Sequence, residues 1–320
     1  MRILVVGSQQ WWRMESGVQR ALRRAGHETL LLNDRVLRQY LGRSLAQRVV
    51  RLAARRFRPD FVFLGKCLGL TLETVAELVR GRRSALWYLD APYYAVPERA
   101  DIAHTIGAGR LADVFFVSGF EAEWRKLGLN AVFLPAAADR DIVPAAPQPA
   151  YAADLTFTGS SYDTARAEFL VALSRRFRVK VWGDDWAAWR DRLDWGGRKV
   201  VEREFAAVCS SSAIMLGLLP GVARAATTYA SDRMWVTGLA GGFYLGQGSP
   251  GVDRLLLDGV HCAWFTDFDS CVRQAERYLA APGEREDIRR RGEAFMRRHH
   301  TFDERVPHLL AGTEWVNPLS

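Results

Sequence analysis

Small residues followed by an arginine form the clearest candidate anion site in the chain. Gly159, Ser160 and Ser161 come directly after the apolar run 155–158 and precede a stretch of helical periodicity. Small residues at such a turn let backbone N–H groups approach a phosphate at a helix N-terminus. Arg166 falls on the first turns of the helix and could add a charge-assisted contact. An ordinary strand-to-helix turn also needs small residues, so both interpretations stay open.

A second candidate site lies in the segment 227–233. This segment leads into a predicted helix that ends in two glycines before the strand 243–245, and a serine or aspartate at 231 or 232 fits its N-cap. Free amides at a helix start, together with an arginine, suit a pyrophosphate. An ordinary capped helix with a surface arginine is the alternative. The candidate residues are Tyr229, Ser231, Asp232, Arg233, Gly241 and Gly242.

Three more loops follow predicted strands at their carboxyl ends, where α/β sheets bind ligands. Trp182 and Gly183 end the strand 179–182, so the indole could border a nucleotide, although a core position suits a tryptophan equally well. Gly7, Ser8 and Gln9 follow the strand 3–6 and could line a second ligand. Asp90 follows the strand 85–88 and could orient a hydroxyl group or act as a base; capping a turn before Pro92 is the alternative.

Several catalytic motifs are missing from the sequence. The six histidines lack metal-ligand spacing, and no metal is predicted. No dinucleotide fingerprint, Gly-Lys-Ser/Thr phosphate loop or Gly-x-Ser-x-Gly elbow occurs, which lowers the expectation of an NTPase or hydrolase. The four cysteines are scattered without paired spacing, so we expect them to be reduced. With no signal peptide or long apolar span visible, a cytoplasmic location is expected.

The elements that would position these loops alternate as β-rich and helical runs. Strands are predicted at 3–6, 29–32, 61–64, 85–88, 114–117 and 131–134, then at 155–158, 179–182, 213–218 and 243–245. Three prolines within 144–149 mark a linker. The predicted fold is α/β, with two Rossmann-like domains facing a cleft. The expected boundaries are 1–145, a linker at 146–150, 151–298, and a tail at 299–320 that packs back on the first domain.

The net charge of +8 comes almost wholly from arginine and indicates an anionic ligand. Base composition of a genome explains arginine richness equally well. Charge alone also suits nucleic acid, but no nucleic-acid-binding motif accompanies it, and no such partner is predicted. The stretch 35–58 is a basic amphipathic helix. We expect its leucine face to pack on the sheet; weak peripheral contact with an anionic membrane is the less favoured alternative.

Taken together, these segments resemble the CgeB-type glycosyltransferases, bacterial proteins of the two-domain architecture called GT-B. The resemblance spans nearly the whole chain and is clearest in the order and spacing of its C-terminal motifs. It rests on Arg233 to Leu245, 265–267, 275–285 and 299–305, with 113–134, 154–160 and Asp90 as further similar stretches. It implies transfer of a sugar from a nucleoside diphosphate sugar to an acceptor hydroxyl, without a metal or another cofactor.

The resemblance also implies roles for the candidate residues. The second domain would hold the donor through Gly159, Ser160, Arg166 and the helix start at Arg233, and the first would hold an unidentified acceptor. One departure concerns Val236, where the family usually carries a glutamate for the donor ribose; Asp232 could take over that role. A catalytically degenerate nucleotide-sugar-binding or scaffold protein is therefore one alternative. An epimerase or phosphorylase of the same fold is another.

Overall fold

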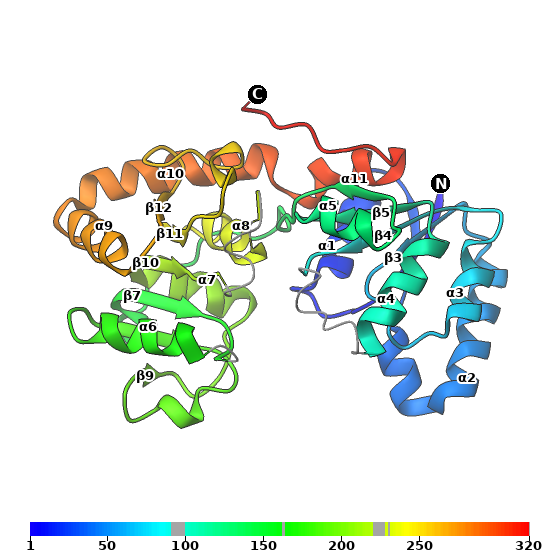
Figure 1. Cartoon of the computed structure of the whole chain (residues 1–320), viewed down its shortest axis with the longest axis horizontal. Coiled ribbons are helices and arrows are strands. Elements are labelled where there is room, and N and C mark those ends of the chain that lie inside the picture. The colour runs from blue at the N-terminus through cyan, green and yellow to red at the C-terminus, as the bar shows by residue number, and fades with distance from the viewer. Residues whose placement is uncertain (91–99, 162–163, 220–227, 230, 320) are drawn as a thin grey trace. The chain divides into compact units, whose positions relative to one another are not determined.

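A computed structural model describes residues 1–90, 100–161, 164–219, 228–229 and 231–319 of the chain (Figure 1). The chain divides into two compact units. Unit 1 consists of Met1–Asp139 and Phe302–Val316, and unit 2 consists of Arg140–Thr301 with the last residues of the chain. The proline-rich segment 144–149 thus belongs to unit 2, ahead of its first strand.

Unit 1 is built on a sheet of six parallel strands in the order β2-β1-β3-β4-β5-β6. Five of its strands are buried along nearly continuous apolar runs because helices cover such sheets on both faces, whereas the edge strand β2 is partly exposed. The strands predicted from the sequence match these six within two residues at each end. They are β1 (Arg2–Val6), β2 (Glu28–Leu32), β3 (Phe61–Leu64), β4 (Arg83–Tyr88), β5 (Val114–Val117) and β6 (Ala131–Phe133).

Two helices of unit 1 were not predicted from the sequence: α11, in the C-terminal segment, and α4. Its glycines break the helical signal, but they also let the helix approach the sheet, because a Cβ on Gly109 would lie 2.7 Å from the Phe115 ring. The last helix, α11, adds the C-terminal segment to unit 1 through a hydrogen bond from Phe302 N to Ala138 O. The helices are α1 (Met14–Arg24), α2 (Asp34–Phe57), α3 (Leu72–Val79), α4 (Ala100–Leu111), α5 (Glu121–Lys126) and α11 (Phe302–Ala311).

Helix α2 corrects one expectation from the sequence. Its leucines do not pack on the sheet: Leu41, Leu45 and Leu52 are all exposed to solvent. The buried side is formed by the smaller Ala46, Gln47, Val50 and Ala54. Gly42 interrupts the helix with a φ of 71°, which changes the direction of the side chains on either side of the break. The sequence pattern identified the helix but assigned its buried face wrongly.

Unit 2 repeats the same architecture with the strand order β12-β11-β10-β7-β8-β9. All its strand pairs are parallel. The α/β class with two Rossmann-like sheets is confirmed. The strands are β7 (Ala153–Thr158), β8 (Val179–Trp182), β9 (Asp194–Trp195), β10 (Ser212–Gly217), β11 (Tyr244–Gln247) and β12 (Ala263–Phe265). The helices are α6 (Thr164–Ser174), α7 (Glu202–Ser211), α8 (Asp232–Leu239), α9 (Phe268–Ala280) and α10 (Pro282–His299).

Apolar clusters cover both faces of the unit 2 sheet. One cluster contains Leu155, Phe157 and Trp186 against α6 and α9, and the other contains Trp182, Met215 and Ala240. The four cysteines are free thiols in buried positions. In the described part of the chain, no helix combines the length and apolar character that crossing a bilayer requires.

Candidate functional site

The carboxyl edge of the unit 2 sheet contains a point where the chain order reverses. From β7 the chain runs outward through β8 to β9, and β10 then starts on the other side of β7. Ligands of open α/β sheets bind at such switch points, because the loops diverge there and leave a crevice. Gly159 follows β7 and Leu218 follows β10, so these two strand ends define the candidate site in unit 2.

Gly159 and Gly183 let two strand ends approach each other closely. Both have positive φ, 151° and 148°, and a Cβ on Gly183 would overlap the carbonyl of Gly159. That carbonyl accepts a 2.6 Å hydrogen bond from Trp186 Nε1. Ser161 is held to the next loop by its hydroxyl, which donates to the Asp185 carbonyl. The loop predicted to bind phosphate is thus anchored through backbone carbonyls of the loops after β7 and β8.

Arg166 joins the two sides of the switch point. Its side chain is buried, and Nη1 donates to the Ser160 carbonyl at 3.1 Å while Nη2 donates to the Leu218 carbonyl at 3.3 Å. Its guanidinium also lies 5.3 Å from the centre of the Phe157 ring. These contacts fix the positions of the loops after β7 and β10. A direct contact of Arg166 with phosphate stays a prediction.

Arg233 reaches the same place from the N-terminus of α8. Its guanidinium lies 4.8 Å from the centre of the Phe157 ring, on which Arg166 also rests. A Cβ on Gly159 would come within 2.6 Å of Arg233 Nη2. Ser231 caps the helix, as predicted, by accepting a hydrogen bond from Arg233 N, and Asp232 is the first helical residue. The structure therefore brings Gly159, Arg166, Arg233 and the start of α8 together.

Two other predicted donor residues, Gly241 and Gly242, do not join this group. They follow the opposite end of α8, about 12 Å along an eight-residue helix. There Gly241, with a φ of 80°, ends the helix, and Gly242 N donates to the Thr237 carbonyl. Both lie at the amino edge of the sheet, before β11.

Trp182 is a core residue by its contacts. Its side chain is 6% exposed, packs in the apolar cluster with Met215 and meets the Tyr151 ring edge to face. Only its backbone reaches the candidate site, where the Trp182 carbonyl accepts from Gly159 N at 2.8 Å. Contact between the indole and a nucleotide stays a prediction.

The short segment Thr228 and Tyr229 is held at the carboxyl end of β11. Thr228 N donates to the Pro250 carbonyl at 2.6 Å, and Ser249 Oγ donates to the Tyr229 carbonyl at 2.9 Å. Thr228 has a φ of 59°, a conformation that β-branched residues rarely adopt. Such outliers concentrate at functional sites. Thr227 and Ala230 of the predicted segment lie outside the described residues.

Unit 1 has its own switch point, between β1 and β3. Gly7 follows β1 and Gly65 follows β3, and the side chain of Glu15 lies against both, since a Cβ on either glycine would overlap it. Burial raises the pKa of Glu15. Sequence reasoning missed this residue. The available signal was a glycine after each of two strands, with an acid in the first turn of the intervening helix α1.

The remaining predicted residues of unit 1 surround this position. The carbonyl of Ser8 accepts from Ser16 Oγ, and Gln9 Nε2 donates to the Leu31 carbonyl. Asp90 forms an ion pair with Lys66, and both side chains are partly exposed. This pair joins the loops after β3 and β4. Residues 91–94, which were expected to continue that loop, lie outside the described residues.

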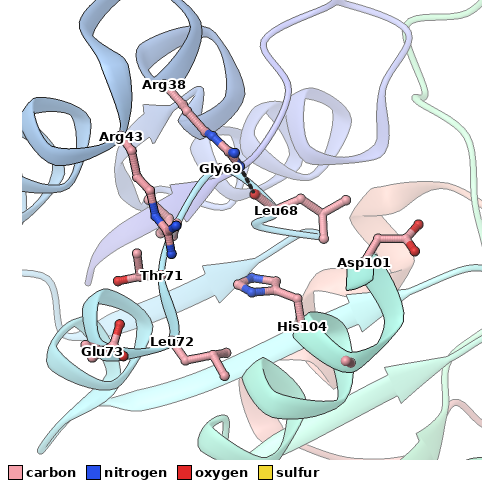
Figure 2. Close-up of a pocket in the computed structure, with 11 residues that line it drawn as sticks. Arg38, Arg43, Leu68, Gly69, Thr71, Leu72, Glu73, Asp101 and His104 are labelled. Atoms are coloured by element: carbon pink, nitrogen blue, oxygen red, sulfur yellow. Dashed lines mark hydrogen bonds between the residues drawn. The ribbon is translucent and has the colours of Figure 1, made fainter. Parts of the chain in front are cut away.

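A pocket of about 600 Å³ opens beside these loops (Figure 2). Arg38 and Arg43 reach into it from α2, and His104 faces them from α4. Arg38 Nη1 donates to the Leu68 carbonyl at 3.3 Å, and His104 Nε2 donates to the Cys67 carbonyl at 3.0 Å. Glu73 and Asp101 add opposite charge. The lining offers both donors and acceptors, as a polyhydroxylated ligand requires.

No cluster of potential metal ligands occurs among the described residues.

Part of the chain matches a known family of proteins. Residues 166–311 match the family model described as glycosyl transferase-like. The match contains Arg166 and Arg233 and covers most of unit 2, as well as α11. No curated protein sequence matches the chain.

Solved structures of similar fold cover almost the entire chain. HepE from Anabaena, in complex with UDP and glucose, has a TM-score of 0.66 at 12% identity, covering 98% of this chain and 100% of that one. Sucrose-phosphate synthase from Thermosynechococcus elongatus has a TM-score of 0.67 at 11% identity, covering 98% of each chain. An α-glucosyltransferase in complex with UDP and DNA has a TM-score of 0.62 at 10% identity, covering 94% and 96%. The chain shares the two-domain α/β fold of these GT-B proteins.

Proposed function

We propose that the protein transfers a sugar from a nucleoside diphosphate sugar to an acceptor hydroxyl without a metal ion. The observation that carries this proposal is the convergence of Gly159, Arg166 and Arg233 on Phe157 at the switch point of unit 2. The glycosyl transferase-like match over residues 166–311 and the UDP complexes of HepE support it. CgeB-type specificity is part of the same proposal.

In this proposal, unit 2 stabilises the leaving diphosphate. The bond between the anomeric carbon and the diphosphate oxygen breaks while the acceptor oxygen bonds to that carbon and releases its proton. Arg233 and the first amides of α8 would compensate the charge that develops on the diphosphate. Arg166 would act as a positioning residue, since its guanidinium holds Ser160 and Leu218 in place.

Asp232 is the proposed replacement for the glutamate expected at Val236. The two residues are four positions apart on α8, so they lie on the same side of the helix. Asp232 is exposed at the helix start, one turn before Val236 and next to Arg233 in the sequence. A carboxylate there could accept hydrogen bonds from a ribose.

The acceptor is assigned to unit 1. Gly7, Ser8 and Gln9 would line it, and either Glu15 or Asp90 would take up the hydroxyl proton. Glu15 lies at the switch point, whereas Asp90 is already paired with Lys66. The pocket in Figure 2 offers donors and acceptors for further hydroxyl groups.

The deciding experiment compares Arg233→Ala with Arg203→Ala, an exposed arginine on α7. UDP and UDP-glucose are titrated in a thermal-shift assay, and release of UDP is followed with a panel of sugar acceptors. We expect the Arg233 variant to lose about 100-fold or more in turnover, with the control unchanged.

Equal turnover in both variants would refute the role of Arg233. Selective donor binding without turnover for any acceptor would instead assign the chain to the binding-only alternative. In that case we expect that Val236→Glu does not create activity. If this variant binds the donor more tightly than the natural chain, ribose recognition was lost from α8 and was not taken over by Asp232.

A further inference from the structure

Helix α2 presents its larger apolar side chains to solvent. Leu45 and Leu52 are 49% and 68% exposed, and Tyr40, before the break at Gly42, is 78% exposed. Leu45 and Leu52 are seven residues apart, which places them two turns apart on one face. Ala46, Val50 and Ala54 form the opposite, buried face. The helix thus packs on unit 1 with small side chains and leaves Leu45 and Leu52 exposed.

The same face carries a strong positive charge. Arg48, Arg55 and Arg56 are exposed and flank Leu45 and Leu52 at helical spacing. The helix contains four further arginines, Arg35, Arg38, Arg43 and Arg51, and its one acidic residue, Asp34, is buried. From the neighbouring helix α3, Glu77 pairs with Arg51 at 3.4 Å and with Arg55 at 3.8 Å. Glu73, also on α3, interacts electrostatically with Arg43 and Arg51, so two carboxylates of α3 face the seven arginines of α2.

We propose that this surface of α2, formed by Leu45, Leu52, Arg48, Arg55 and Arg56, docks onto a membrane rich in anionic lipids. Leucines at the centre of a basic face enter the boundary between headgroups and acyl chains, while arginines contact lipid phosphates. Long arginine side chains reach the headgroups while their apolar stems stay near the leucines. The helix would lie in the plane of the interface.

Other partners fit this surface less well. A symmetric contact with a second copy of the chain would place the same arginines opposite one another. A nucleic acid would use the arginines but would leave Leu45 and Leu52 without a role. An anionic bilayer uses both the charge and the apolar side chains. The proposal does not depend on sugar transfer.

The test is sedimentation of the full-length protein with phosphatidylcholine vesicles, with and without about one-third phosphatidylglycerol. We expect pelleting with the anionic vesicles and release by high salt. Arg48→Gln, Arg55→Gln and Arg56→Gln together should weaken partitioning about 100-fold, because each basic residue at the surface contributes about fivefold. Leu45→Ser with Leu52→Ser should also release the protein, although charge is unchanged.

Matched control variants separate the effect of this surface on vesicle binding from the effect of the total charge. Arg203→Gln, Arg254→Gln and Arg273→Gln change three exposed arginines outside α2, so both triple variants lower the net charge from +8 to +5. The control triple should still pellet. The proposal is wrong if both triples behave alike, if the leucine variant pellets like the natural chain, or if the natural protein binds a polynucleotide or forms dimers but does not pellet.

Discussion

The guanidinium of Arg233 occupies the space that a side chain on Gly159 would need. A Cβ at Gly159 would lie 2.6 Å from Arg233 Nη2. Gly159 belongs to the loop after β7 and Arg233 to the start of α8, 74 positions later in the sequence. The absence of a side chain at one position thus creates the place for the cation at the other, and this contact can be tested directly.

Gly159→Ala should displace Arg233 and weaken UDP binding at least tenfold. The φ of 151° will also add a strain of about 1–3 kcal/mol. Gly197→Ala is the matched control, because Gly197 also has a positive φ, 79°, but nothing lies within 4 Å of its Cβ position. Isothermal titration with UDP should separate the two variants, with a lower affinity for Gly159→Ala and an unchanged affinity for Gly197→Ala. Equal UDP affinity in both would contradict the proposed contact.

Arg166→Met should destabilise unit 2 by about 2–3 kcal/mol, because the buried carbonyl of Leu218 and the partly buried carbonyl of Ser160 both lose a donor. Arg175→Met, at an exposed position just after α6, should change stability by about 0.5 kcal/mol or less. Chemical denaturation gives both values. A small effect at Arg166 would mean that its hydrogen bonds do not hold the switch point together.

Glu15→Gln should stabilise the protein at neutral pH and lose this advantage in acid. Burial raises the pKa of Glu15 above its ordinary value of 4.5. Below that value the carboxyl group is protonated in both the folded and the unfolded chain. As the pH rises through the higher folded pKa, ionisation in the buried position costs folding free energy, which glutamine avoids.

Melting temperatures of the Glu15→Gln variant and the natural chain, measured between pH 4 and pH 7, check this prediction. Glu314→Gln makes the same chemical change at an exposed position and serves as the control. The difference between the Glu15 variant and the natural chain should grow with pH. A constant difference would show that the charge of Glu15 is not the cause.

Gly17→Ala should loosen the C-terminal segment from unit 1. A Cβ on Gly17 of α1 would overlap the Phe302 ring at the start of α11. Overpacking of this kind costs about 1–3 kcal/mol. Gly283→Ala, near the start of α10, has open space around its Cβ position and should be neutral or slightly stabilising. Hydrogen exchange of α11 should rise in the first variant only.

Much of the fold could be predicted from the sequence. Buried parallel strands are short apolar runs, and β1, β3 and β5 were located nearly to the residue because their signal is local. Helix α4 was missed because Gly107 and Gly109 interrupt its apolar periodicity. In the structure these glycines allow the helix to pack closely against Leu72 and Phe115. The buried side of α2 was assigned wrongly because the pattern shows which residues share a face, but not which face meets the sheet.

The sequence by itself determined the fold class of the protein, its strand–helix alternation and the residue types that we propose for binding a diphosphate. Tertiary structure decided which of these residues meet. It joined Gly159, Arg166 and Arg233 around Phe157, placed Gly241 at the far end of α8, buried Trp182 in the core and brought Glu15 between Gly7 and Gly65. The physical reason is that strand order is set by packing between distant segments, and the switch points exist only once the sheets have formed.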